Sequence, residues 1–141
     1  MTCAEAVRLY LLTVTPLTAL VNTRIWTFRF PQSPTKPGVC VFQISDPRDA
    51  HLRGTDGLRF DRVQIDVIAD SIAAARSVDQ AVMGAYVNGA ATGLMGAQAV
   101  VGSPAVEIIQ PGSSDNYHEE YDADELKQAR VRRDYRVWFR E

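Results

Sequence analysis

The fold is decided by the stretch VRRDYRVWFRE, residues 131–141, which alternates between two kinds of side chain. The first row is mostly apolar and consists of Val131, Arg133, Tyr135, Val137 and Phe139. The second row is charged apart from a tryptophan and consists of Arg132, Asp134, Arg136, Trp138 and Arg140. Successive side chains of a β-strand point to opposite faces of a sheet. The pattern therefore predicts a strand over residues 126–140 with one face on the core and an arginine-rich outer face.

A second pattern, RVQIDVIADSIAAARSVDQAV over residues 62–82, predicts a strand that runs into a helix. Apolar residues alternate with polar ones over residues 58–69, which is typical of a half-buried strand. Asp70 or Ser71 is expected to cap the helix, and Asn88-Gly89 is expected to end it. The apolar stripe of this helix has a spacing of 3.6 residues and consists of Ile72, Ala75, Val78, Val82, Ala85 and Tyr86.

The remaining elements complete an α+β pattern. Residues 3–14 predict an amphipathic helix that begins with a capping box of Thr2 and Glu5 and ends before Pro16, with a further turn over residues 16–21. Further strands are predicted over residues 24–30, 39–45 and 100–109. Because the strands follow one another without helical crossovers, we expect a mostly antiparallel sheet of four to five strands, with two main helices packed on one face.

Two polar stretches without an apolar pattern, residues 46–57 and 111–124, are predicted to be long loops. Loops of about 12 residues or more in a compact domain are usually functional or disordered. The first stretch is therefore the candidate surface for contact with other proteins. Its candidate residues are Asp46, Arg48, Asp49, His51, Arg53 and Asp56.

The length and the amino-acid composition are those of one ordinary globular domain over residues 1–141. The formal net charge of -2 does not indicate sequence-independent electrostatic binding to nucleic acid. Cys3 and Cys40 lie in no CxxC or metal-binding spacing, so we expect no disulfide scaffold and a reducing compartment. Because Cys3 lies at the start of a predicted helix and Cys40 in an apolar predicted strand, we expect neither to be a nucleophile. The apolar run over residues 9–21 is too short to span a bilayer. We expect a soluble protein, made inside the cell, that does not contact membranes.

No motif with a catalytic mechanism is visible in the sequence, so we expect no enzyme and no cofactor. The glycines fit neither a phosphate-binding loop nor a nucleophile elbow. His118 lies close to several carboxylates in NYHEEYDADE, residues 116–125, but this stretch lacks the alternation of a hard-cation loop. A small enzyme or ligand-binding domain that uses His118 remains an alternative.

Charge is segregated near the C-terminus, where an acidic stretch over residues 115–125 precedes the arginine-rich strand. Of the 15 lysines and arginines, only Lys36 and Lys127 are lysine. Arginine and tryptophan are enriched where proteins contact one another, so this bias favours ordered contacts. The candidates for a contact between subunits are Arg132, Arg136, Trp138 and Arg140 on one side, and Glu119, Glu120 and Asp122 on the other.

Several of these segments together resemble the small tail-completion proteins of long-tailed bacteriophages, of the tail-terminator type. The segments are VNTRIW over residues 21–26, the proline-rich loop over residues 31–41, VQID and the alanine-rich helix over residues 63–85, and the closing strand over residues 132–139. The resemblance covers nearly the whole chain. It implies a homohexameric ring that caps the tail tube, stops its polymerisation and joins the tail to the head connector.

The resemblance also implies the partners and the location. The partners are further copies of the chain, the tail tube protein and a neck or head-closure protein, and DNA passes through the lumen without sequence-specific binding. Assembly takes place in the host cytoplasm, and the protein ends at the tail–neck junction of the virion. A neck or head-closure protein of the same particle is the alternative that the sequence separates least.

Overall fold

The structure is a computed structural model that describes residues 2–45, 48–51, 54–84, 86–87, 90–91, 93–94, 99–101, 106–123 and 127–140. Two of the predicted contact residues, Asp46 and Arg53, lie outside the described residues. For Arg48, Asp49, His51, Asp56 and Arg140 the structure describes the backbone only.

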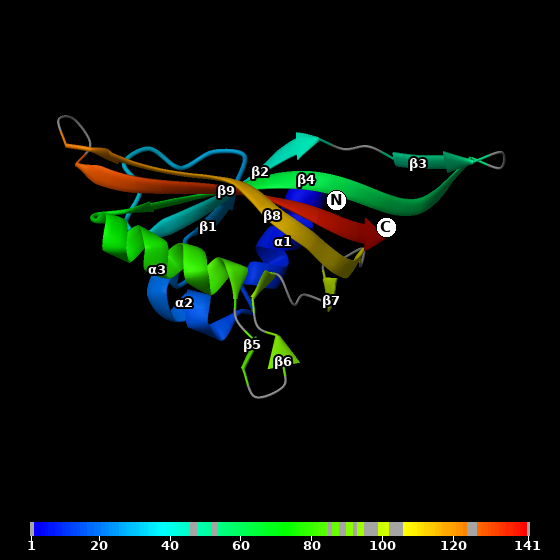
Figure 1. Cartoon of the computed structure of the whole chain (residues 1–141), viewed down its shortest axis with the longest axis horizontal. Helices are drawn as coiled ribbons and strands as arrows, with labels where there is room; N and C mark the ends of the chain where they lie inside the picture. The colour runs from blue at the N-terminus through cyan, green and yellow to red at the C-terminus, as the bar shows by residue number, and fades with distance from the viewer. Residues whose placement is uncertain are drawn as a thin grey trace.

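A 7-stranded sheet forms one layer of the molecule (Figure 1), with the order β1-β2-β4-β9-β8-β7 and β3 paired to β4. Its strands are β1 (Ile25–Thr27), β2 (Gly38–Ser45), β3 (Arg48–His51), β4 (Gly54–Ala69), β7 (Ala99–Val101), β8 (Val106–Asp122) and β9 (Gln128–Arg140). Among the described strand pairs of this sheet, only β1 and β2 are parallel. A separate hairpin consists of β5 (Tyr86–Val87) and β6 (Ala90–Ala91).

Three helices lie on one side of this sheet (Figure 1): α1 (Cys3–Leu11), α2 (Thr15–Val21) and α3 (Ile72–Met83). The predicted capping box is present, since Thr2 Oγ1 accepts from the Glu5 N–H at 3.2 Å and Glu5 Oε2 accepts from the Thr2 N–H at 2.8 Å. The predicted further turn after Pro16 is α2, with Pro16 in its first turn. Ser71 caps α3 by accepting from the Ala74 N–H.

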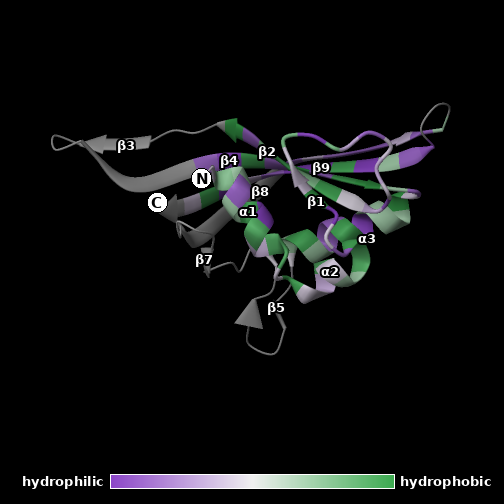
Figure 2. Cartoon of the chain, turned by 180° about the vertical axis from the view of Figure 1, so that it is seen from behind, coloured by the Kyte–Doolittle hydropathy of each residue, from purple (hydrophilic) through white to green (hydrophobic). Residues whose placement is uncertain are grey.

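The core lies between the helices and the inward-facing positions of the sheet. Val63, Ile65 and Val67 of β4 and Val131 and Tyr135 of β9 are all buried in it. Hydrophobic and hydrophilic residues alternate along β9 (Figure 2), as the sequence predicts. The α+β class, the mainly antiparallel sheet and the helices on one face are confirmed.

The prediction of long loops over residues 46–57 and 111–124 is wrong, because most residues of both segments lie in strands. Residues 48–51 and 54–59 form the β3–β4 hairpin, with Ala50 opposite Thr55. Residues 111–122 belong to β8, whose register against β9 shifts at three places. Each shift changes which face the following residues point to. An apolar alternation cannot persist across such shifts, so the sequence shows no strand period there.

The predicted end of the third helix is also wrong. α3 ends at Met83, and Gly84 at its C-cap has φ 87°, a conformation that favours glycine. The stop signal is therefore Gly84 rather than Asn88-Gly89, which lie outside the described residues.

Within the described residues, no single helix is long and apolar enough to cross a membrane; α1 and α2 pass such a test only as a pair bent by 87°.

Candidate assembly surface

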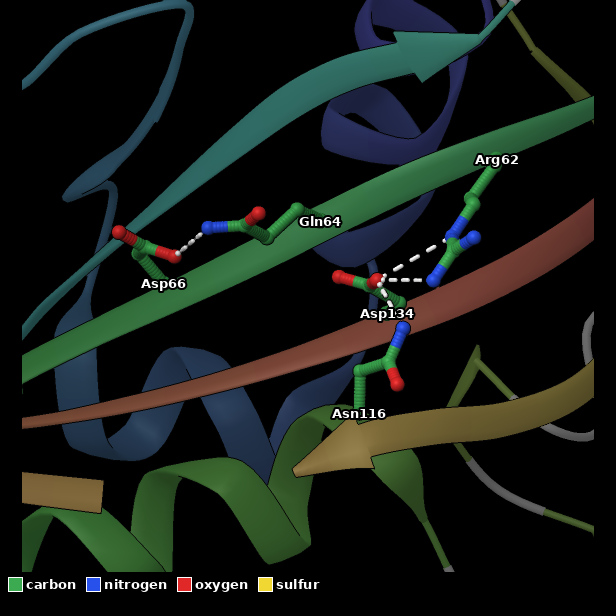
Figure 3. A network of polar contacts seen from close by, with 5 residues as sticks. All are labelled: Arg62, Gln64, Asp66, Asn116 and Asp134. Carbon is green, nitrogen blue, oxygen red and sulfur yellow. Dashed lines mark hydrogen bonds and ion pairs between the residues drawn. The ribbon is translucent and has the colours of Figure 1, made fainter. Parts of the chain in front are cut away.

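The face of the sheet that points away from the helices carries a polar network between β4, β8 and β9. Arg62 donates to Asp134 Oδ2 through Nε at 3.1 Å and through Nη2 at 2.7 Å, and the Asn116 amide donates to the same oxygen at 3.0 Å (Figure 3). On β4 the Gln64 amide donates to Asp66 at 2.8 Å. We call this side of the sheet the open face.

The register between β4 and β9 determines which charges meet on the open face. Asp66 lies opposite Arg132, and its carboxylate is 3.3 Å from Arg132 Nε. The Asp66 side chain is buried, whereas Arg132 is 38% exposed. Arg136 lies opposite Arg62 and is exposed, and Trp138 is half-buried beside it. The outer row of β9 is therefore partly neutralised within the chain before any partner binds.

An aromatic pair from β1 and the following loop covers one end of the open face. The Trp26 and Phe30 rings meet edge-to-face at 5.7 Å, and the Arg130 guanidinium lies 5.9 Å from the Phe30 ring centroid. Trp26 packs over Gly38, where an added Cβ would lie 2.6 Å from the indole. Next to this cover, Cys40 is fully buried, and its burial together with the nearby Asp66 raises the pKa of its thiol to about 12. This thiol is therefore not a nucleophile at neutral pH.

Beside the aromatic cover runs a groove of about 420 Å³ across β2, β4 and β9. Its lining combines apolar and charged groups: Phe30, Phe42, Gln43, Ile44, Gln64, Asp66, Arg130 and Arg132. Ile44 is 48% exposed. The Nε atoms of Arg130 and Arg132 are buried and donate no hydrogen bond to any described residue. The groove thus holds two arginine donors next to exposed apolar surface.

On the helix side of the sheet, a second polar cluster ties β8 and β9 to α3. Arg133 donates to the buried Asp79 through Nε at 3.2 Å and through Nη2 at 2.9 Å, and its guanidinium lies 4.5 Å from the Tyr117 ring. The Tyr117 hydroxyl donates to Glu119 at 2.6 Å, and Arg76 donates to Glu119 at 2.9 Å through Nε. We call these five residues the helix-side clamp.

The helix-side clamp lowers the pKa of its Glu119 carboxyl group. Hydrogen bonds from Arg76 and then from Tyr117 lower the pKa of Glu119 to about 2. The same contact with Glu119 raises the pKa of Tyr117. Glu119 is therefore ionised at any pH near neutrality, and it is committed to a contact inside its own chain.

The acidic stretch predicted from the sequence divides between two faces. Glu119 points to the helix side, where it meets Arg76, whereas Glu120 lies beside His118, whose Nε2 is 3.6 Å from the Glu120 carboxylate. In the register, His118 lies opposite Arg132 and Glu120 opposite Arg130. Among the described residues, no group of three or more His, Cys, Asp or Glu is placed to hold a metal ion.

The sequence prediction missed the apolar part of this surface. The sequence predicts Phe42 and Ile44 only as part of one strand, and Phe30 as the end of another. Phe42 and Ile44 both line the groove, although the register of β2 against β4 shifts between Gln43 and Ser45. Their spacing of two residues is the one signal in the sequence for a shared face. Nothing in the local sequence shows that Phe30 reaches Arg130, one hundred positions further along the chain.

Comparisons with known proteins show a shared fold. No family model matches the chain, and no curated protein matches it. Among solved structures, the fold is similar to that of a chain in the virion of a native gene transfer agent (GTA) particle, with a TM-score of 0.52 and 16% sequence identity. The match covers 98% of this chain and 92% of that chain. A likeness at this identity shows the fold alone.

Proposed function

We propose that this protein is a structural component of the virion of a long-tailed phage or of a phage-like particle. One observation carries the proposal: the fold match to a chain of a GTA virion extends over nearly the whole of both chains. The sequence motifs that resemble tail-completion proteins support the same conclusion independently. Because fold alone does not determine function, the proposal depends on the two lines of argument together.

Within that class we propose the tail-terminator role. The protein forms a homohexameric ring that caps the tail tube, ends its polymerisation and joins the tail to the head connector, while DNA passes through the lumen. It acts without a cofactor and is not an enzyme. It assembles in the host cytoplasm and remains at the tail–neck junction. A ring requires a head-to-tail contact between two different patches of the same subunit.

The candidate patches for that contact are the outer row of β9 and the acidic end of β8. The outer row comprises Arg132, Arg136, Trp138 and Arg140, and the acidic end comprises Glu119, Glu120 and Asp122. Glu119 is the weakest of these candidates, because it already accepts hydrogen bonds from Arg76 and Tyr117. The β3–β4 hairpin, at the opposite end of the sheet from the last residues of β8 and the first of β9 (Figure 1), is the candidate contact for the tube or the neck.

Deletion of the gene, followed by electron microscopy of the particles, tests the tail-terminator role. Overlong tail tubes are expected, because nothing would stop polymerisation. Free tails of normal length would instead indicate a neck or head-closure protein. Particles with normal, attached tails would refute both roles.

The same deletion strain tests the hairpin. A chain that lacks residues 48–57 is expected to fold and form rings but to leave tails unjoined. Loss of folding, measured by circular dichroism, would contradict this division of labour.

A further inference from the structure

Among the described residues that line the groove on the open face are two arginines, Arg130 and Arg132, and one carboxylate, Asp66. Arg132 has Asp66 at 3.3 Å, whereas Arg130 makes its described contact with the Phe30 ring. The Nε atom of Arg130 is buried and has no hydrogen-bond acceptor among the described residues, whereas that of Arg132 lies beside the Asp66 carboxylate. A buried donor without an acceptor costs roughly 1–3 kcal/mol. A ligand that fits the groove would therefore bring a carboxylate together with an apolar group to cover Ile44.

One described segment of the same chain has this combination, at the outer end of β8. Tyr121 is 50% exposed, the largest exposed fraction among the large hydrophobic side chains described. Glu120 precedes it with a side chain that is 50% exposed. Tyrosine and arginine are among the residue types that most often dominate binding energy at protein interfaces. We call the segment of residues 120–122 the β8 tip.

Within one subunit Glu120 lies opposite Arg130, at the edge of the groove, but Tyr121 cannot reach Ile44. The strand β8 is held in the sheet beside β9, with Tyr121 opposite Ala129, whereas Ile44 lies on β2, on the far side of β4. A tip that covers Ile44 with its tyrosine therefore belongs to a second copy. Groove and tip are different patches, so the contact is head-to-tail, which is the kind that closes into a ring.

We propose that the groove between Ile44 and Arg130 receives the β8 tip of a neighbouring copy. The tyrosine covers the exposed apolar wall, and the tip carboxylate reaches the arginine donors. This inference rests on the proposed ring and specifies which surfaces form it.

Cysteine crosslinking tests the pairing, because the native Cys3 and Cys40 are both fully buried. Two variants, Ile44→Cys and Tyr121→Cys, are purified separately, mixed, and treated with a short bismaleimide, both free in solution and in assembled particles. Covalent dimers are expected in the mixture and not in either variant alone. The matched control pairs Tyr121→Cys with Leu20→Cys, a residue of α2 that is 41% exposed on the helix side.

Assembly gives a second measurement. Tyr121→Ala is expected to weaken self-association at least tenfold by native mass spectrometry, whereas Leu20→Ala leaves it unchanged. Circular dichroism checks that both variants fold.

The outcomes separate this inference from the proposed function. Rings or intact tails without the mixed crosslink, in solution and in particles, would overturn the groove–tip contact and leave the tail role standing. Crosslinks from either variant alone would replace the head-to-tail contact with a two-fold one. Normal tails in the deletion strain would refute the tail role even where the crosslink forms.

Discussion

Neighbouring arginines on β9 have opposite roles on the two faces of the sheet. Arg133 points toward α3, where Asp79 and Tyr117 enclose it, and its side chain is 16% exposed. Arg132 points to the open face beside Asp66, with its side chain 38% exposed. The helix-side pair joins two layers of the fold, whereas the open-face pair joins two adjacent strands that already share backbone hydrogen bonds. The stability of the fold should therefore depend more on the Arg133–Asp79 pair than on the Arg132–Asp66 pair. Assembly with other copies should depend on the open face.

Removal of the helix-side partner should give the largest effect. Asp79→Ala leaves the Arg133 charge in a mostly buried site without its carboxylate, and loss of one partner of a buried pair costs about 3–5 kcal/mol. Urea denaturation monitored by circular dichroism measures this loss of unfolding free energy. Glu120→Gln, a change at an exposed carboxylate, serves as the control and should leave it nearly unchanged. A loss below about 1 kcal/mol for Asp79→Ala would show that the clamp does not join the layers.

A change in the other ion pair of the open face, between Arg62 and Asp134, should cost less. Asp134→Ala removes the oxygen that accepts hydrogen bonds from Arg62 and Asn116. The Arg62 side chain is 33% exposed, so its guanidinium can donate hydrogen bonds to solvent water instead. We expect a loss of about 1–3 kcal/mol, measured in the same denaturation experiment. Asp134→Asn keeps the shape and an acceptor, so it should recover part of the loss. If Asp134→Ala proves as costly as Asp79→Ala, the contrast between the two faces is wrong.

How far the sequence predicts this molecule depends on whether a feature is local. The strands β4 and β9 and the start of α3 follow from periodicity and capping, which are local signals. β8 does not, because its register shifts interrupt the period of two residues. The β3–β4 hairpin, which the sequence analysis predicts as a loop, is defined by backbone pairing between its two strands. Backbone pairing alone requires no particular side-chain pattern, so the sequence does not indicate it.

The helix-side clamp was predictable in part. Arg133 stands in the apolar row of β9, and Asp79 follows Val78 and lies three residues before Val82 in the buried stripe of α3. Opposite charges at inward-facing positions of two elements that pack together imply an ion pair, since an unpaired charge is rarely buried. The groove was not predictable in this way, because it depends on Phe30 folding back over a distant strand.

The smallest expected effect lies at the edge of the clamp and depends on pH. The folded chain holds the pKa of Glu119 at about 2, below its ordinary value of 4.5. A lowered carboxyl pKa contributes stability that is fully present above the unfolded value and is lost as pH falls through the folded value. The unfolding free energy of the wild type should therefore fall relative to that of Glu119→Gln between about pH 4.5 and pH 2.

The ion pair behind this effect is partly screened, because Arg76 is 58% exposed to solvent and salt. The difference in unfolding free energy between the two proteins should therefore be smaller in 1 M salt. Denaturation across this pH range, with NMR titration of the Glu119 carboxyl, measures both quantities. An ordinary Glu119 pKa would show that Arg76 and Tyr117 do not hold this carboxylate, and that the clamp consists of the Asp79–Arg133 pair alone.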